Sequence, residues 1–275
     1  MTNRLNPSNT LSRTPKGKSM SRWFSHLLLL AVSCLISLHS PASDFQLTPY
    51  QLIYRASYNG MPIDADRQLQ QRPDGSWELA TTASNFLASI REQGTFGIDK
   101  NGSIRNYGYQ YKRSVFGKKK TEDLVYDHAN NTATYTSDKK TRQVSLERDY
   151  LNRLSYQVQL RRDLASGAKQ LEYQVISRGR LKTYLFEKAG EEILETPLGA
   201  VRAIRVDRIR EDDDRQTALW FAPDLDYLLV KLWQREKDGE EYEISIKDGN
   251  SQGISLTEHL NKLSKSMNYE KIAVK

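Results

Sequence analysis

This sequence predicts an all-β domain with one interior helix, an antiparallel meander that closes or curls into a β-barrel-like single domain. Three observations predict it. Apolar and polar side chains alternate over several runs, Asn-Gly and Asp-Gly dipeptides fall between those runs, and long helical patterns are scarce. Strands with one buried and one wet face alternate in this way, and such dipeptides tolerate the positive φ of tight hairpins. A two-sheet sandwich is the competing arrangement.

The strands are predicted first from four runs of clear alternation, at 52–58, 106–111, 170–175 and 241–247. Further strands are predicted at 76–83, 88–99, 121–127, 132–137, 141–146, 181–187, 200–210, 217–221 and 227–235. The connections are short, so consecutive strands are expected to be neighbours. A parallel sheet would need helical crossovers, which the sequence lacks. So many strands must hide their edges, and closing or curling the sheet achieves this.

One interior helix is predicted over 149–164. Leu151, Leu154 and Val158 recur at helical spacing there, and Gly167 follows as a stop. A second, shorter helix is predicted over 255–267, where Leu256 and Leu260 share a face. It lies beyond the last strand, as a docked lid or a frayed tail.

The first 43 residues predict a signal peptide with an N-terminal extension. They contain five Lys or Arg and no acidic residue, and they end in an apolar run too short for a comfortable membrane span. Small residues place cleavage near Ala42 or Ser43, which predicts the periplasm. Two alternatives are a buried N-terminal helix and a lipoprotein anchored through Cys34. The remaining chain is divided into a β-barrel-like domain at 44–250 and a tail at 251–275.

The charge of the mature chain excludes one class of partner. Five of the 41 Lys and Arg precede residue 44, so 36 remain against 34 acidic residues. Nucleic-acid binding is not expected, because it needs a strongly basic surface. If the leader is removed, Cys34 goes with it, which excludes disulfides and a thiol nucleophile.

No catalytic residue, metal site or cofactor is predicted. The chain lacks a Gly-x-Ser-x-Gly elbow and a phosphate-binding glycine loop. After residue 43 its histidines are His128 and His259, and neither has a second ligand at metal-binding spacing. The acidic run at 211–214 is interpreted as a solvated turn rather than a calcium loop. Whether the protein is an enzyme stays open, with a non-enzymatic role favoured.

A basic loop is the candidate surface for a partner. Lys112 and Arg113 precede the apolar tip 115–117, and Lys118, Lys119 and Lys120 follow it. In an exported protein, clustered lysines favour anionic lipid head groups, which predicts a possible peripheral membrane contact. The alternative is a soluble hairpin whose charges prevent edge pairing.

The candidate ligand-lining residues are aromatic. Tyr107, Tyr109 and Tyr111 are predicted to share one face and, with Trp220 and Trp233, to line a cavity for an apolar or glycan ligand. Packing within a filled barrel is the alternative.

Three segments carry a resemblance to a known family. They are 195–203, with its Pro-Leu-Gly turn; 220–223, a Trp-Phe-Ala-Pro sequence; and 226–228, Asp-Tyr-Leu. Together with 154–162 they resemble the bacterial domain-of-unknown-function family 3108, over about 45–247. Leu229 stands where many members have proline. The resemblance implies an exported, mostly β protein, and it transfers no catalytic residue.

The leading functional hypothesis is an exported periplasmic protein that binds an apolar or amphipathic envelope molecule, lipid or lipid-like, or a partner protein, in or beside its barrel. The alternatives are an envelope hydrolase with a non-standard site and a structural or assembly factor of the cell envelope. A cleft that joined a Ser or Thr to one of the two histidines and a carboxylate would favour the hydrolase.

Overall fold

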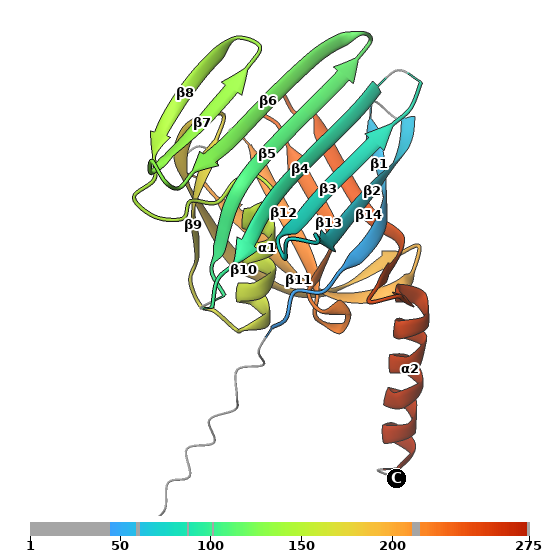
Figure 1. Cartoon of the computed structure of the whole chain (residues 1–275). Coiled ribbons are helices and arrows are strands. Elements are labelled where there is room, and N and C mark those ends of the chain that lie inside the picture. Colours follow the sequence, from blue (N-terminus) through green and yellow to red (C-terminus); the bar gives the residue numbers. More distant parts are fainter. Residues whose placement is uncertain (1–44, 59–60, 87, 101, 211–214, 274–275) are drawn as a thin grey trace, which may run out of the picture. The chain divides into compact units, whose positions relative to one another are not determined.

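The computed structural model describes residues 45–58, 61–86, 88–100, 102–210 and 215–273. In these residues fifteen strands form one antiparallel sheet, accompanied by two α-helices and a short 3-10 helix. The sheet is curled rather than closed, and α1 lies inside its curve (Figure 1). The predicted fold class is therefore confirmed. The predicted leader and the acidic run at 211–214 lie outside the described residues.

The strands are β1 (Tyr50–Tyr58), β2 (Met61–Gln71), β3 (Trp77–Ser84), β4 (Ala88–Ile98), β5 (Ile104–Val115), β6 (Lys118–Asp127), β7 (Thr132–Ser137), β8 (Lys140–Ser145), β9 (Leu171–Ser177), β10 (Arg180–Thr196), β11 (Gly199–Ile209), β12 (Gln216–Ala222), β13 (Leu228–Arg235), β14 (Glu241–Ser251) and β15 (Ile254–Ser255). The helices are α1 (Ser155–Ala165), η1 (Pro223–Leu225) and α2 (Leu256–Ala273).

The first and the last long strands of the chain lie next to each other in the middle of the sheet. β1 pairs with β14, so the two halves of the sheet meet at the first and last long strands. From β1 the strands follow one another to β8, and from β14 they run back to β9. Every neighbouring pair except β1 with β14 is joined by a sequence-adjacent connection, which is the meander expected from the short hairpins.

The two ends of this sheet path come close without a hydrogen-bonded ladder between them. The turn between β9 and β10 lies against β7 and β8, because a Cβ placed on Gly179 would lie 2.8 Å from Tyr135 Cδ1 and 3.0 Å from Arg142 Cβ. On the other side, the edge of β9 pairs briefly with the segment before α1, where the Leu151 amide donates to the Gln174 carbonyl at 2.9 Å. We call the junction of β8 with the β9–β10 turn the seam.

The concave face of the sheet is packed by α1. Its buried apolar side chains join those of the strands in one continuous core: Tyr156, Val158, Leu160 and Leu164. Apolar residues on every second strand position supply the rest, as in β7, where Ala133 and Tyr135 are buried and their neighbours are not. The interior is therefore filled by helix and side chains.

Two buried amides attach α1 to the sheet. Asn106 of β5 donates from Nδ2 to the Tyr150 carbonyl at 2.9 Å and accepts at Oδ1 from Asn152 Nδ2 at 2.8 Å. The Asn152 Oδ1 accepts from the amides of Leu154 and Ser155, both at 2.9 Å, where α1 begins. The helix begins at Ser155 rather than at the predicted residue 149, because the Asn152 side chain accepts hydrogen bonds from the Leu154 and Ser155 amides and so caps the helix there.

The sequence predicted thirteen of the fifteen strands but missed β2 and β15 and predicted β10 too short. β2 was not predicted, because its inward positions include Arg67, a charged side chain that is nevertheless buried. That guanidinium donates to Gln157 Oε1 at 2.9 Å. β10 runs nine residues beyond the predicted end at 187, through a bulge between Lys188 and Gly190. The short β15 was also not predicted, and the helix predicted at 255–267 is α2.

Candidate functional site

A basic hollow of about 350 Å³ opens on β3, β4, β5 and β6 near their hairpin turns. Its lining residues are Thr82, Ala83, Ser84, Ser89, Ile90, Arg91, Lys112, Arg113, Ser114, Lys119, Lys120 and Thr121. The register arranges them in three rows across the four strands. The first row is Thr82, Arg91, Lys112 and Thr121, the second is Ala83, Ile90, Arg113 and Lys120, and the third is Ser84, Ser89, Ser114 and Lys119.

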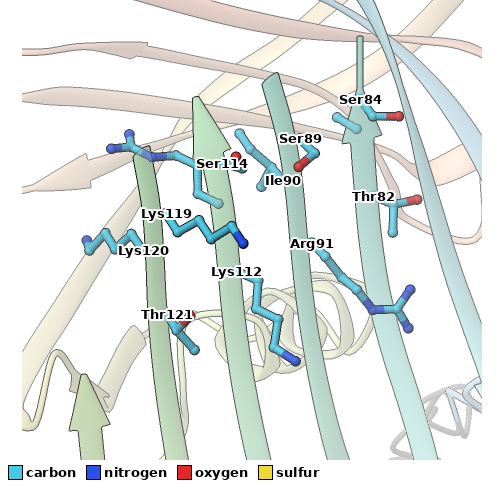
Figure 2. A pocket seen from close by; sticks show the side chains of 12 residues that line it. Thr82, Ser84, Ser89, Ile90, Arg91, Lys112, Ser114, Lys119, Lys120 and Thr121 are labelled. Carbon is cyan, nitrogen blue, oxygen red and sulfur yellow. The ribbon is translucent and has the colours of Figure 1, made fainter. Parts of the chain in front are cut away.

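The middle row turns its side chains away from the hollow. Lys120 shares a strand face with the buried Glu122 and Leu124, so this row faces the core side of the sheet. The side chains of the first and third rows face the opposite, convex side and form the walls of the hollow. The backbone of the middle row forms its floor. Lys119, Lys112 and Arg91 lie there on three adjacent strands (Figure 2). The hollow is thus an outward-facing site.

Cations and hydroxyl groups are the polar groups of these walls. Arg91, Lys112 and Lys119 bring three positive charges, and five Ser or Thr residues bring hydroxyls that can donate hydrogen bonds. No acidic side chain is among the described lining residues. Arg91 donates from one nitrogen to Gln93 Oε1 at 3.0 Å. Such a set of donors suits an anion with several oxygens, such as a phosphate group.

The three predicted lysines are separated by the alternation of β6. Lys119 lies on the wall of the hollow, whereas Lys120 points to the core side, with Nζ 2.6 Å from Glu122 Oε1 and 5.7 Å from the Tyr111 ring centroid. Lys118 is exposed beside the β5–β6 turn. Only part of the predicted basic run can therefore face one outside partner.

A charged cluster lies beneath the hollow, on the core side of the same strands. The Tyr109 hydroxyl donates to Glu92 Oε1 at 2.6 Å, and Arg153, just before α1, lies 4.0 Å from Glu92 and 3.9 Å from Glu122. Burial, and then the negative charge of Glu92, raise the pKa of Tyr109. Burial lowers the pKa of Arg153, but Glu92, Tyr109 and Glu122 outweigh that effect and raise it overall. This cluster attaches the segment just before α1 to β4–β6.

The prediction that the three tyrosines of β5 share one face is wrong for Tyr107. A bulge between Thr95 and Phe96 of β4 sets Gly108 opposite Thr95 and Asn106 opposite Phe96, which leaves Tyr107 without a partner. Asn106 and Tyr109 are both buried, while Tyr107 is 44% exposed and contacts the His128 ring edge-on at 6.3 Å. Tyr109 is core and Tyr111 is half-buried against it, with Arg153 over its ring.

The two predicted tryptophans lie elsewhere, on the face of β12 and β13 opposite Leu219 and Leu232. Trp220 is held between Arg205 and Lys231, at 5.4 and 5.1 Å from its ring centroid, and donates from Nε1 to Glu192. Trp233 donates to Glu241 at 3.2 Å and borders a second hollow of about 150 Å³. The five predicted aromatic residues therefore do not line one cavity.

Neither histidine has the surroundings of a general base. His128 Nε2 donates to the Asn106 carbonyl at 2.7 Å, its Nδ1 lies 3.7 Å from Asp149 Oδ1, and its ring stacks on Tyr126. Both nitrogens therefore face groups that hold the ring in place. His259 is exposed on α2. In the described part of the chain no three His, Cys, Asp or Glu side chains gather as a metal site.

Sequence reasoning placed Lys112 and Lys119 on one basic hairpin but missed the other wall residues of the hollow. Arg91 and the five Ser and Thr residues come from several strands, and only the pairing register aligns them with the two lysines. Arg91 and the serines of β3 and β4 had no local signal.

Among the helices of the described residues, none is at once long and apolar enough to cross a membrane.

Comparison with known proteins gives a family and a fold. The sequence model described as "Protein of unknown function (DUF3108)" matches residues 53–247. No protein with a curated description matches the chain. Among solved structures, a β-barrel-like protein of the DUF1849 family from Brucella abortus is similar with a TM-score of 0.50 at 9% identity, over 76% of this chain and all of that one.

A more distant similarity is to the MucA/MucB complex of Pseudomonas aeruginosa, with a TM-score of 0.34 at 12% identity. It covers 77% of this chain and 54% of that one. The likeness to the Brucella protein supports the curled β-barrel-like fold, and neither similarity identifies a ligand or a reaction.

Proposed function

This chain belongs to the DUF3108 family of proteins of unknown function, and from that premise we propose that it is a non-enzymatic periplasmic protein that binds an amphipathic envelope molecule. The bound part is the anionic, phosphate-bearing head group, and the basic hollow is its site. The periplasm follows from the predicted signal peptide, which precedes the residues matched by the family.

The observation that carries the proposal is the composition of the walls of the hollow. Three cations and five hydroxyls from four strands line the hollow, with no carboxylate among the described lining residues. Each cation near an anionic lipid surface contributes about 1 kcal/mol, and hydroxyl donors add direction to the charge. A neutral sugar or a cation would leave these charges uncompensated.

The location of the hollow supports binding beside the barrel. α1 and its core contacts occupy the concave side of the sheet. The hollow is open on the convex face and is large enough for a head group. The ligand therefore binds beside the barrel rather than inside it.

The test compares two double variants of the folded protein. Lys112→Gln with Lys119→Gln removes two wall charges, while Lys182→Gln with Lys188→Gln removes the same net charge from exposed positions on β10. Titration calorimetry measures binding of a short-chain phosphatidylglycerol kept below micelle formation, with phosphatidylcholine of equal chain length as comparison.

We expect wild-type protein to bind the phosphatidylglycerol, and the first variant to bind it about 30-fold more weakly, because two contributions of about 1 kcal/mol are lost. The β10 variant should bind as the wild type does. Equal weakening in both variants, or no binding by the wild type, would contradict the proposed site.

A further inference from the structure

Two phenylalanines stand exposed at neighbouring hairpin turns above the basic hollow. Phe86, in the β3–β4 turn, is 87% exposed, and Phe116, in the β5–β6 turn, is 69% exposed. Ala88 pairs with Val115, so the two turns lie at the same end of adjacent strands. Neither ring contributes to the core, and together they form an apolar rim.

The backbone of the β5–β6 turn holds Phe116 at this position at a conformational cost. Phe116 has φ +48° and Gly117 has φ +77°, the pair of positive values of a two-residue hairpin turn. For a bulky residue this conformation costs about 1 kcal/mol or more, and asparagine or glycine is the usual occupant. A strained aromatic residue that packs against nothing in the core points to a use outside the fold.

The cations lie along the strands below the rim, at the depth that lipid head groups would occupy if the rim entered a bilayer. Lys119 lies opposite Ser114, two residues along β5 from Phe116, and Lys112 is four residues from it, so their backbones lie about 7 and 13 Å below Phe116. Lys118 lies beside the turn, and Arg91 of β4 is opposite Lys112 of β5 in the strand register. Interfacial segments place apolar side chains about 5–10 Å into the head group and acyl boundary, with basic side chains around them.

We infer that this rim docks on an anionic bilayer, with Phe86 and Phe116 inserted below the head groups and Arg91, Lys112, Lys118 and Lys119 at the phosphates. The inference deepens the proposed function and rests on it for the shared cations, since it identifies the source of the head group as a membrane leaflet. The apolar part of the ligand then stays in the bilayer while its phosphate occupies the hollow.

The test measures sedimentation with vesicles of pure phosphatidylcholine and of phosphatidylcholine mixed with phosphatidylglycerol. The variant is Phe86→Ser with Phe116→Ser, and the control is Val125→Ser with Ile193→Ser, two exposed apolar residues away from the rim. We expect binding to the anionic vesicles only, falling with added salt. The rim variant should bind them about 100-fold more weakly, whereas the control should match the wild type.

A second measurement does not depend on the serine variants. In Phe116→Trp the new indole should shift its emission to shorter wavelength, and brominated lipids should quench it, with anionic vesicles alone. Wild-type binding to neutral and anionic vesicles alike, or normal vesicle binding by the rim variant, would overturn the inference.

The two proposals fail in different ways. If the rim variant binds vesicles normally while Lys112→Gln with Lys119→Gln loses the short-chain phosphatidylglycerol, the hollow binds a phosphate group but the rim does not insert. If vesicle binding depends on both phenylalanines but the lysine variant keeps its affinity for the short-chain lipid, the rim docks and the hollow is not the head-group site.

Discussion

At the scale of single residues, the position of α1 depends on one buried amide. Asn152 is fully buried and satisfies its polar atoms through Asn106 and the first amides of α1. Its own backbone amide donates to the Ser155 hydroxyl at 2.9 Å. A buried polar group in such a network stabilises only while every member has a partner, so the loss of one leaves others uncompensated.

We therefore expect Asn152→Ala to lower the free energy of unfolding by about 2–4 kcal/mol, because it removes the acceptor of two amides and orphans the Asn106 Oδ1. Urea denaturation measures the change. Gln159→Ala, which breaks a partly exposed contact with Asp163 within the same helix, is the control and should cost about 0.5 kcal/mol or less. Similar small losses in both variants would show that the amide network does not hold α1.

At the scale of the elements, the seam relies on a glycine at a turn. Gly179 has φ +69°, and the space where a Cβ would lie is occupied by Tyr135 and Arg142 of the facing strands. Gly239, in the β13–β14 turn, has φ +87° with nothing within 4 Å of its Cβ position. Alanine substitutions at these two glycines therefore separate the free-energy cost of a positive φ from the cost of a steric contact.

Gly239→Ala is expected to cost about 1–2 kcal/mol, the penalty of alanine in the left-handed region alone. Gly179→Ala should cost about 1–3 kcal/mol more, since the added methyl must displace two side chains of the seam. Thermal or urea unfolding of the two variants gives the comparison. If their losses are equal, the β9–β10 turn does not pack on β7 and β8 as described.

The elements also show where sequence reasoning succeeds and where it ends. Alternation and turn dipeptides predicted most strands, because half-buried strands must alternate. β2 escaped because burial of Arg67 depends on Gln157 and Thr81, which lie far away in the sequence. Tyr107 was misplaced because a bulge leaves no mark in the residue pattern. The hollow was missed for the same kind of reason, because its rows of side chains form only when the four strands pair in this register.

At the scale of the whole described domain, tyrosines hold the core together and tie its stability to pH. Burial raises the pKa of Tyr156 to about 12. It also raises the pKa of Tyr54, Tyr126 and Tyr173 above the ordinary value of 10.0. In the unfolded chain these hydroxyls ionise near pH 10, while in the folded protein they keep their protons.

Stability should therefore be fully present below about pH 10 and should fall as the pH rises above it, because only the unfolded state gains by losing the protons. Urea midpoints at increasing alkaline pH measure the decline. Tyrosinate absorbance should appear for the buried rings together with unfolding. Tyr156→Phe keeps its ring contacts with Tyr184 and Phe186 and should decline less steeply. A gradual titration of all tyrosines in protein that stays folded would contradict this expectation.

The seam has a further consequence for the size of the domain. A closed barrel has its diameter fixed by strand number and stagger, so widening it would break ladder hydrogen bonds. In the described residues β8 and β9 are not joined by ladder hydrogen bonds, so the circumference of this sheet is not fixed by strand pairing. A bulkier side chain on α1, or a small displacement of that helix, can be accommodated by parting one joint while the pairing of every other strand stays intact.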